Sequence, residues 1–351
     1  MTANDDTGHG GPRAALLDAV LEASVVGSFS RLGYDVRSRL AHWQDLPNQG
    51  GRVVVVTGAS SGIGRAAAVG LARLGASVWL VGRDRARTAE AADEARAAAA
   101  DAGLDEVVEI EPVVLDVTDA AGVDEFVARF GARHDALHGL VHSAGALSAD
   151  YRRTPDGTEL TVATGVLAPF RLTWLLAPAL RAAGDATIVT VSSGGMYTQR
   201  FDLGRLLMGP DGYRGAVAYA RAKRAQVVLS HEWARRWGAD GVASYAMHPG
   251  WVDTPGLHRG LPSFTRLGPL LRHPAQGADT AVWLVAGAAR RPGARCARQL
   301  EGFFLDRRRR GEHHLPWTRT GASPAEEGAA LWAWCASATG VGGGGPGGGA
   351  A

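Results

Sequence analysis

A run of valines followed at once by a glycine-rich loop constrains the fold of this chain more than any other feature. The run from Val53 to Val56 is continuously apolar, as expected for a parallel strand that is buried on both faces. The loop Thr57-Gly58-Ala59-Ser60-Ser61-Gly62-Ile63-Gly64 follows it, and a helical pattern then continues to Leu74. Glycines in such a loop permit a tight turn, let a pyrophosphate approach the backbone, and let helix and strand pack closely. Because the helix N-terminus then faces the anion, the segment predicts a dinucleotide-binding site.

Beyond this loop, short apolar runs alternate with helical patterns. That alternation is typical of a doubly wound parallel sheet, so the predicted fold class is α/β, with a Rossmann-type sheet in a single domain and helical N- and C-terminal extensions. Further strands are predicted at 77–81, 107–115, 138–141, 186–191, 241–247 and 302–305, and helices at 85–101, 119–133, 157–182 and 215–237.

The two ends of the chain differ in composition from the domain between them. Ser323, Pro324 and Glu326 form the start signal of a C-terminal helix. For residues 14–46 two interpretations stay open: helix packed outside the main domain, or peripheral contact with a membrane surface or a partner. The predicted units are a disordered tail at 1–12, a helical extension at 13–50, the NAD(P)-binding domain at 51–320, a helix at 321–338 and a disordered glycine-rich tail at 339–351.

Charge and cysteine content exclude some classes of protein. The chain has 37 basic and 35 acidic residues among 351, so nothing in its net charge of +2 favours a nucleic-acid partner. Cys296 and Cys335 are the two cysteines, which imply no disulfide framework and fit a cytoplasmic location. Asp18 and Glu22 interrupt the first apolar stretch, which argues against a signal peptide or a membrane span there.

A tyrosine and a lysine at helical spacing indicate the chemistry. Tyr219 and Lys223 are four residues apart in a predicted helix, so they share one face of it. A free tyrosine loses its proton near pH ~10, and a neighbouring cation favours the phenolate and lowers that pKa. We therefore expect Tyr219 to exchange a proton with a substrate oxygen as a general acid/base.

The end of the second predicted strand bears on the choice of dinucleotide. An acid at that place would hydrogen-bond the ribose 2′-hydroxyl and select NAD, but Gly82 stands there. Arg83 follows, and a guanidinium suits a 2′-phosphate. Asp84 lies ~20 residues past the loop and would indicate NAD, but we expect it to cap the next helix. The predicted cofactor is NADP(H) in preference to NAD(H).

With these residues in place, the chain resembles the short-chain dehydrogenase/reductase family over about residues 50–290. The runs 191–196, 247–256 and 276–280 are similar to a narrower branch, that of dehydrogenase/reductase member 12. The residues that carry the family resemblance are the loop Thr57–Gly64, Asp116-Val117, Ser143-Ala144-Gly145, Ser193, Tyr219 with Lys223, Pro249-Gly250, Val252 and Thr254.

The resemblance implies hydride transfer between NAD(P)(H) and the carbonyl or alcohol carbon of a small molecule. It makes Tyr219 the general acid/base, Lys223 the residue that lowers its pKa and holds the nicotinamide ribose, and Ser193 a hydrogen-bonding partner of the substrate oxygen. It also makes a homo-oligomer plausible, although the sequence does not exclude a monomer. The cofactor-binding residues it implies are Gly58, Ser60, Ser61, Gly62, Ile63, Gly64, Arg83, Asp116, Val117, Ser143, Ala144, Gly145, Tyr219, Lys223, Pro249, Gly250, Val252 and Thr254.

Two positions depart from the family's pattern. His142-Ser143 stands where the family has two asparagines, and both side chains can still form local hydrogen bonds. Gly165 stands where the family places an asparagine that helps to hold a proton-relay water, and Pro169 follows one turn later. Backbone carbonyls could hold that water instead. An alternative function therefore stays open, that of a dinucleotide-binding sensor or scaffold with little catalytic activity.

The remaining polar and irregular segments receive simpler interpretations. The run Arg307–Arg310 is expected in a solvated loop, with contact to an anionic lipid or acidic partner as the alternative. His248 is expected to shape a turn, and His313-His314 lack zinc-ligand spacing, so no metal is predicted. The irregular runs 194–215 and 251–274 carry aromatic residues and are expected to form a lid over an apolar carbonyl substrate.

Overall fold

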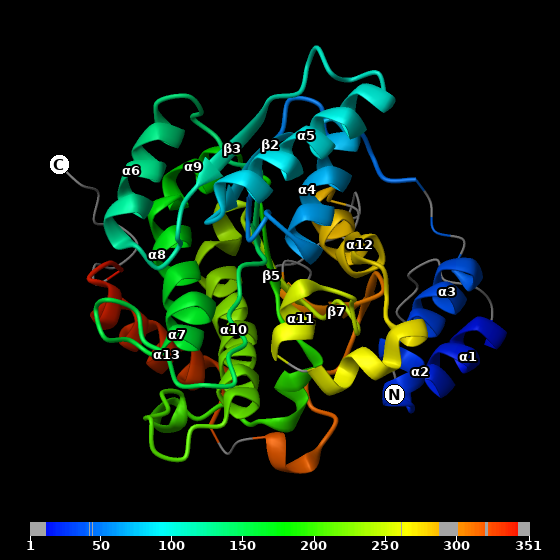
Figure 1. The fold of residues 1–351 in the computed structure, drawn as a ribbon, viewed down its shortest axis with the longest axis vertical. Helices are drawn as coiled ribbons and strands as arrows, with labels where there is room; N and C mark the ends of the chain where they lie inside the picture. The colour runs from blue at the N-terminus through cyan, green and yellow to red at the C-terminus, as the bar shows by residue number, and fades with distance from the viewer. Residues whose placement is uncertain are drawn as a thin grey trace.

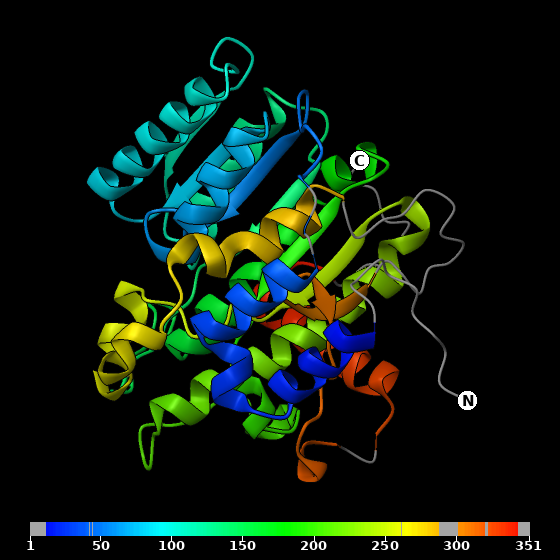
Figure 2. The same ribbon diagram turned by 90° about the vertical axis from the view of Figure 1, so that its right-hand side faces the viewer.

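An eight-stranded sheet with helices on both faces forms the centre of the protein (Figures 1 and 2). The computed structural model describes residues 12–41, 43, 45–260, 262–287, 301–319 and 322–342. The strand order is β3-β2-β1-β4-β5-β6-β7-β8, and all neighbours are parallel except the last pair. This confirms the predicted doubly wound α/β sheet. The strands are β1 (Val53–Thr57), β2 (Ser77–Gly82), β3 (Ile110–Val114), β4 (Gly139–His142), β5 (Thr187–Val191), β6 (Ala243–Met247), β7 (Glu301–Leu305) and β8 (Arg308–Arg309).

Two apolar layers hold the helices against the sheet. Alternate side chains of each strand point to opposite faces, so Val54 and Val56 join one layer and Val55 joins the other. The first layer lies under α4 (Gly62–Arg73), α5 (Arg85–Asp101) and α12 (Pro274–Val285). The second lies under α6 (Ala120–Gly131), α8 (Ala168–Leu175) and α10 (Gly215–Trp237).

The C-terminal helix α13 (Pro324–Thr339) covers the outer side of α10. The predicted capping box is present, because the Ser323 hydroxyl accepts a hydrogen bond from the Glu326 backbone N–H and the Glu326 side chain bonds back. Leu331 and Trp332 are buried, and the Trp332 ring packs edge-on against Phe170 at a centroid separation of 4.9 Å. The segment is therefore part of the second apolar layer.

Two predicted elements have different boundaries. The third strand begins at Ile110 instead of Val107, which lies in a turn and is 69% exposed. The predicted helix 157–182 begins only at Leu160, has a π-helical turn at Ala163–Leu167 and breaks at Leu176 between α8 and α9 (Ala177–Ala182). Pro169 has no N–H for the carbonyl four residues earlier, so the regular hydrogen-bond ladder cannot run through this stretch.

The N-terminal extension forms three short helices instead of one. They are α1 (Pro12–Glu22), α2 (Val25–Phe29) and α3 (Arg31–Leu40), and Ser24 caps α2 by accepting a bond from the Gly27 N–H. They lie together beside α12, where the Gln276 side chain bonds Asp35 (Figure 1). Among the described residues, no helix has the length and apolar character needed to cross a bilayer. The predicted tails lie outside the described residues, apart from Pro12 and residues 339–342.

The prediction of a solvated loop at Arg307–Arg310 was wrong. Asp306 and Arg307 both have positive φ angles, 53° and 56°, and close a two-residue hairpin between β7 and β8. Arg307 pairs with Asp279 of α12 at 2.6 Å, and Arg308 and Arg310 pair with Asp18 of α1. Carboxylates of α12 and α1 therefore pair with three of the four arginines that the sequence suggested would face water.

Candidate active site

A cavity of about 590 Å³ opens at the carboxyl ends of the parallel strands, the edge where ligands bind in sheets of this kind. Every predicted site residue lines it except Gly64. Gly64 lies behind the wall and packs against the turn, where a Cβ atom would come within 2.4 Å of the Gly58 carbonyl oxygen. This position of Gly64 fits the role predicted for a glycine in the loop, which is to let helix and strand pack closely. The structure thus brings together predicted site residues from seven separate segments of the chain.

The glycine loop shapes the anion-facing part of this cavity. Gly58 has a φ angle of +69°, and a Cβ atom there would lie 2.7 Å from the Ala144 backbone nitrogen. Ser61 is the N-cap of α4, but its side chain makes no capping hydrogen bond. The first turn of α4 also carries no acidic residue. The N–H groups at this helix terminus therefore remain available to an anionic ligand.

Thr57 connects the glycine loop to the loop after β4. Its hydroxyl oxygen accepts hydrogen bonds from the backbone N–H groups of Ser143 at 3.2 Å and Ala144 at 3.3 Å. The same hydroxyl donates to the Val141 carbonyl at 3.3 Å. One side chain therefore fixes the strand end from which Ser143, Ala144 and Gly145 face the cavity.

At the end of β2, two arginine side chains line the cavity, whereas the position of Gly82 cannot hold an acidic side chain. A Cβ atom at Gly82 would lie 2.4 Å from the Thr88 hydroxyl oxygen and 2.9 Å from Ser60 Cβ. Arg83 lines the cavity, and so does Arg87, which the sequence analysis did not single out. Arg83 precedes the N-cap of α5 and Arg87 lies in its first turn, so the signal that could have found Arg87 was a second arginine just after the predicted cap Asp84. Asp84 caps α5 by accepting from the Arg87 N–H at 3.0 Å, as expected.

Ser193, Tyr219 and Lys223 meet at the end of β5. The Lys223 ammonium nitrogen lies 5.4 Å from the centre of the Tyr219 ring and donates to the Val191 carbonyl at 2.7 Å. Ser193 lies within hydrogen-bonding reach of the Tyr219 hydroxyl and also accepts a bond from the Gly195 N–H. Ser192 points the other way, and its hydroxyl donates to the Lys223 carbonyl at 2.9 Å. The Ser193 hydroxyl therefore lies beside Tyr219, whereas the Ser192 hydroxyl is bonded to the backbone of α10.

The pKa of Tyr219 departs from our expectation. Burial raises it above its usual value, and the hydrogen bond with Ser193 only partly opposes that rise. Burial also lowers the pKa of Lys223 to about 7, so the cation that was expected to favour the phenolate is itself destabilised. Without ligands, Tyr219 therefore keeps its proton at neutral pH.

A glutamine on α10 contacts the position where the family's asparagine is missing. The Gln226 amide donates to the Gly165 carbonyl at 2.7 Å, and Gly165 lies in the π-helical turn before α8. Pro169 cannot donate to that carbonyl because it has no N–H. Gln226 therefore supplies a donor to the turn, while within the described residues its own side-chain oxygen has no partner.

Two buried histidines near the site are neutral. Burial lowers the pKa of His142 to about 3, and its ring bonds the Thr173 hydroxyl at 2.7 Å. Burial, followed by the charge of Arg272, also lowers the pKa of His248 to about 3. The His248 Nδ1 atom accepts a bond from the Gly250 N–H at 3.1 Å, which fits the expected turn-shaping role.

The walls of the cavity include residues that the sequence did not indicate. Val25 and Phe29 of the N-terminal helices line it, and no local pattern could have placed them there. Trp251 lines it as the predicted lid requires, but Met196 and Tyr197 instead pack in a buried cluster behind it.

The contact between Gln226 and Gly165 predicts a cost for Gln226→Leu. Leucine is apolar and similar in size to glutamine, but it lacks the amide that donates to the Gly165 carbonyl. We therefore expect a loss of ~1 kcal/mol in the free energy of unfolding. Urea unfolding measures it. Gly165→Ala is the matched control, because its Cβ would meet Gln226 and Ala222 at 3.6 and 3.7 Å and keep the hydrogen bond. A Gln226→Leu protein as stable as the wild type would show that this bond contributes nothing.

The lowered pKa of Lys223 predicts a pH-dependent stability. An unfolded lysine titrates near ~10.4, so between about pH 7 and that value the unfolded state binds more protons than the folded state. The contribution of Lys223 to stability is therefore lowest below about pH 7 and increases as the pH rises towards ~10. The stability of Lys223→Met relative to the wild type should fall across this range in urea titrations. A difference that does not change with pH would show that Lys223 keeps an ordinary pKa.

Comparison with known proteins agrees with this geometry. A family model described as short chain dehydrogenase matches residues 52–260. Dehydrogenase/reductase SDR family member 12 of Bos taurus is 37% identical over 301 residues, which cover 85% of this chain and 90% of the relative. The crystal structure of an uncharacterized protein from Mycobacterium Paratuberculosis is similar with a TM-score of 0.62 and 26% identity, covering 85% of this chain and 98% of the other.

A further similar structure holds ligands. L-Sorbose reductase from Gluconobacter frateurii, complexed with NADPH and L-sorbose, has a TM-score of 0.58 and 25% identity, covering 75% of this chain and 97% of the other. The extent of the family match and the identity to member 12 together show the family. The chain belongs to the short-chain dehydrogenase/reductase family, in the branch of member 12, and is an NAD(P)-binding oxidoreductase of CH–OH or C=O groups.

Proposed function

We propose that this protein is an NADPH-preferring reductase of an apolar carbonyl compound, with Tyr219 as its general acid. The observation that carries the proposal is the meeting of Ser193, Tyr219 and Lys223 in the same cavity as the glycine loop. A dinucleotide-binding function alone would not require a buried lysine beside a tyrosine hydroxyl.

The residues around the cavity fit a dinucleotide. The uncapped N-terminus of α4 suits the pyrophosphate, and Asp116 and Val117 line the side where the adenine would lie. Pro249, Gly250, Val252 and Thr254 line the opposite part, where they would hold the nicotinamide. When bound, the reduced dinucleotide supplies the hydride.

Proton transfer is assigned to the tyrosine. Because burial raises its pKa, the Tyr219 hydroxyl carries a proton at neutral pH and can donate it to a carbonyl oxygen as that oxygen gains negative charge. The Ser193 hydroxyl can donate a second hydrogen bond to the same oxygen. Lys223 then stabilises the phenolate that remains, and it would also bond the ribose of the nicotinamide.

The preference for NADPH rests on the end of β2. Arg83 and Arg87 both line the cavity there, and Gly82 leaves no room for the acid that would bind a 2′-hydroxyl. A guanidinium pairs well with a phosphate through parallel hydrogen bonds. The NADPH bound to the similar L-sorbose reductase supports the same choice.

The walls beyond the reacting groups indicate the substrate class. Val25, Phe29, Leu147, Trp251 and Leu257 line this side of the cavity and give it apolar surface, with Thr198 and Arg259 as polar lining residues. A cavity of about 590 Å³ is in the range of small-molecule sites. We therefore infer a small apolar ketone or aldehyde as the substrate.

Tyr219→Phe tests the catalytic assignment. A panel of aldehydes and ketones, followed by the loss of NADPH absorbance, first identifies a substrate. The variant should then retain NADPH affinity but turn over ~10²-fold more slowly or worse, since it lacks the donated proton. Tyr151→Phe is the control, because Tyr151 packs against Tyr213 outside the cavity. Turnover by Tyr219→Phe at the rate of this control would overturn the assignment.

Arg83→Ala tests the preference for NADPH. A charge-assisted hydrogen bond contributes about 1.5–3 kcal/mol, so wild type should bind NADPH roughly tenfold to a hundredfold more tightly than NADH. The variant should lose most of that difference by weakening NADPH alone. Fluorescence titration of both cofactors measures it, with Arg85→Ala as the control because Arg85 is only two residues away, at the start of α5, and does not line the cavity. If wild type binds NADH as tightly as NADPH, the preference is wrong.

A further inference from the structure

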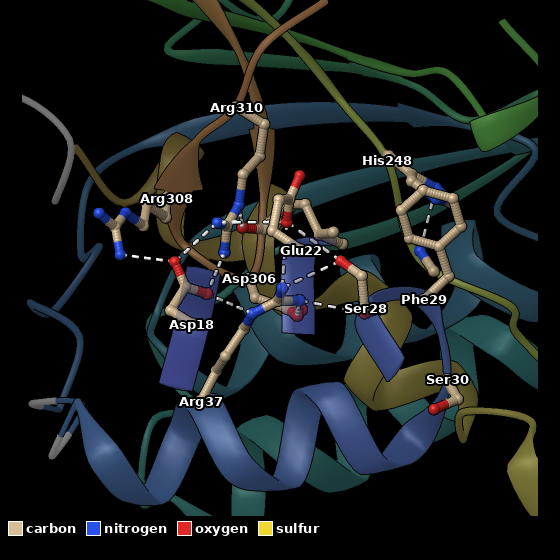
Figure 3. A network of polar contacts seen from close by, with 12 residues as sticks. Asp18, Glu22, Ser28, Phe29, Ser30, Arg37, His248, Asp306, Arg308 and Arg310 are labelled. Carbon is tan, nitrogen blue, oxygen red and sulfur yellow. Dashed lines mark hydrogen bonds and ion pairs between the residues drawn. The ribbon is translucent and has the colours of Figure 1, made fainter. Parts of the chain in front are cut away.

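A buried network of charges joins the N-terminal helices to the hairpin of β7 and β8 (Figure 3). Arg37 of α3 donates to the carboxylates of Asp18 at 2.7 Å and Asp306 at 2.8 Å. Arg310 also pairs with Asp18. Burial raises the pKa of Asp306, but Arg272 and Arg37 more than offset this and hold it below its usual value. Removing Asp306 would take away the carboxylate that pairs with the buried charge of Arg272, which is costly.

Arg272 extends this network to the active site. Its side chain is 1% exposed, and it pairs with Asp306 at 2.6 Å. The same guanidinium donates to the carbonyls of Ser28 at 2.9 Å and of Phe29 and Ser30 at 3.1 Å. These carbonyls lie at the junction of α2 and α3, where a helix end leaves acceptors without intrahelical partners. Arg272 therefore fixes the backbone of Phe29.

The opposite side of Arg272 contacts the turn after β6. Its guanidinium donates to the Pro249 carbonyl at 3.3 Å, and a Cβ atom at Gly250 would lie 2.2 Å from its Nε atom. The Trp251 N–H donates to the Phe29 carbonyl at 2.7 Å. The N-terminal helices and the turn that the proposed function assigns to the nicotinamide are thus held by one buried side chain.

The position of the Phe29 ring follows from these contacts. The ring packs edge-to-face on His248 with centroids 4.2 Å apart, and on Trp251 at 6.2 Å. It is 7% exposed and lines the same cavity as Ser193 and Tyr219. The N-terminal extension therefore contributes a rigid aromatic surface on the substrate side of the site.

We infer that Phe29 is a substrate-contacting residue that limits the size of the carbonyl compound the cavity accepts, and that Arg272 positions it. The inference rests on the proposed function, since it assumes that a carbonyl substrate occupies this cavity. It assigns the N-terminal helices to the active site, whereas the sequence suggested only an external helix or contact with a membrane surface or a partner.

Phe29→Ala tests the inference with two aryl ketones of different size, acetophenone and benzophenone. The ratio of kcat/KM for benzophenone to that for acetophenone should rise about tenfold, because removing the ring enlarges the cavity. NADPH affinity should not change. Leu32→Ala is the control, since Leu32 is on α3, 56% exposed and outside the cavity wall. An unchanged ratio in a Phe29→Ala protein that melts like the wild type overturns the inference.

A second variant and a binding measurement complete the test of Phe29. If Phe29→Ala does not fold, Phe29→Leu retains apolar volume and should change the ratio in the same direction. Calorimetric dissociation constants of both ketones, measured with NADP⁺ bound, give the same ratio without turnover. Absence of turnover by wild type therefore counts against the proposed function, whereas an unchanged ratio of dissociation constants counts against Phe29.

Arg272→Lys tests the positioning role. Lysine keeps the charge for Asp306 but cannot donate to four carbonyls and a carboxylate at once. If Arg272 positions Phe29, the variant should shift the ketone ratio in the same direction as Phe29→Ala. A fall in melting temperature with the ratio unchanged would mean that Arg272 has only a structural role.

Discussion

The parallel arrangement of the sheet determines where every part of the site lies. Carboxyl ends of parallel strands meet at one edge, so loops that are distant in sequence converge there. The glycine loop after β1, the Arg83 segment after β2 and the Ser143 loop after β4 meet Ser193, which follows β5, at that edge. A single hydroxyl, that of Thr57, is enough to fix two of these loops to each other.

Desolvation is the second physical influence on the site. Lys223 is buried and donates to the Val191 carbonyl, and the energetic cost of burying its charge lowers its pKa. Arg272 is equally buried but has a carboxylate and several carbonyls around it, so its charge is compensated. This difference fits their proposed roles. The charge of Lys223 can change when a ligand binds, whereas Arg272 stays charged and fixes the position of Phe29.

Local sequence signals predicted the elements well, and contacts between distant segments were the source of the errors. The glycine loop, the Asp84 cap and the Ser323 capping box each depend on residues within one turn of a helix. The run Arg307–Arg310 was assigned to solvent because its partners, Asp279 and Asp18, are far away in sequence. The π-helical turn at Gly165 was likewise not predicted, since the sequence indicated only that Pro169 follows one turn later.

The sequence by itself determined the fold class, the family and most of the residues that line the cavity, because these depend on short-range periodicity and on glycines with fixed geometric tasks. Tertiary structure alone decided that Phe29 belongs to the cavity, that Gln226 contacts Gly165, and that burial raises the pKa of Tyr219. Contacts of this kind depend on which surfaces pack together, and pKa values depend on how far that packing removes water. Neither these contacts nor these pKa values can be read from the spacing of nearby residues.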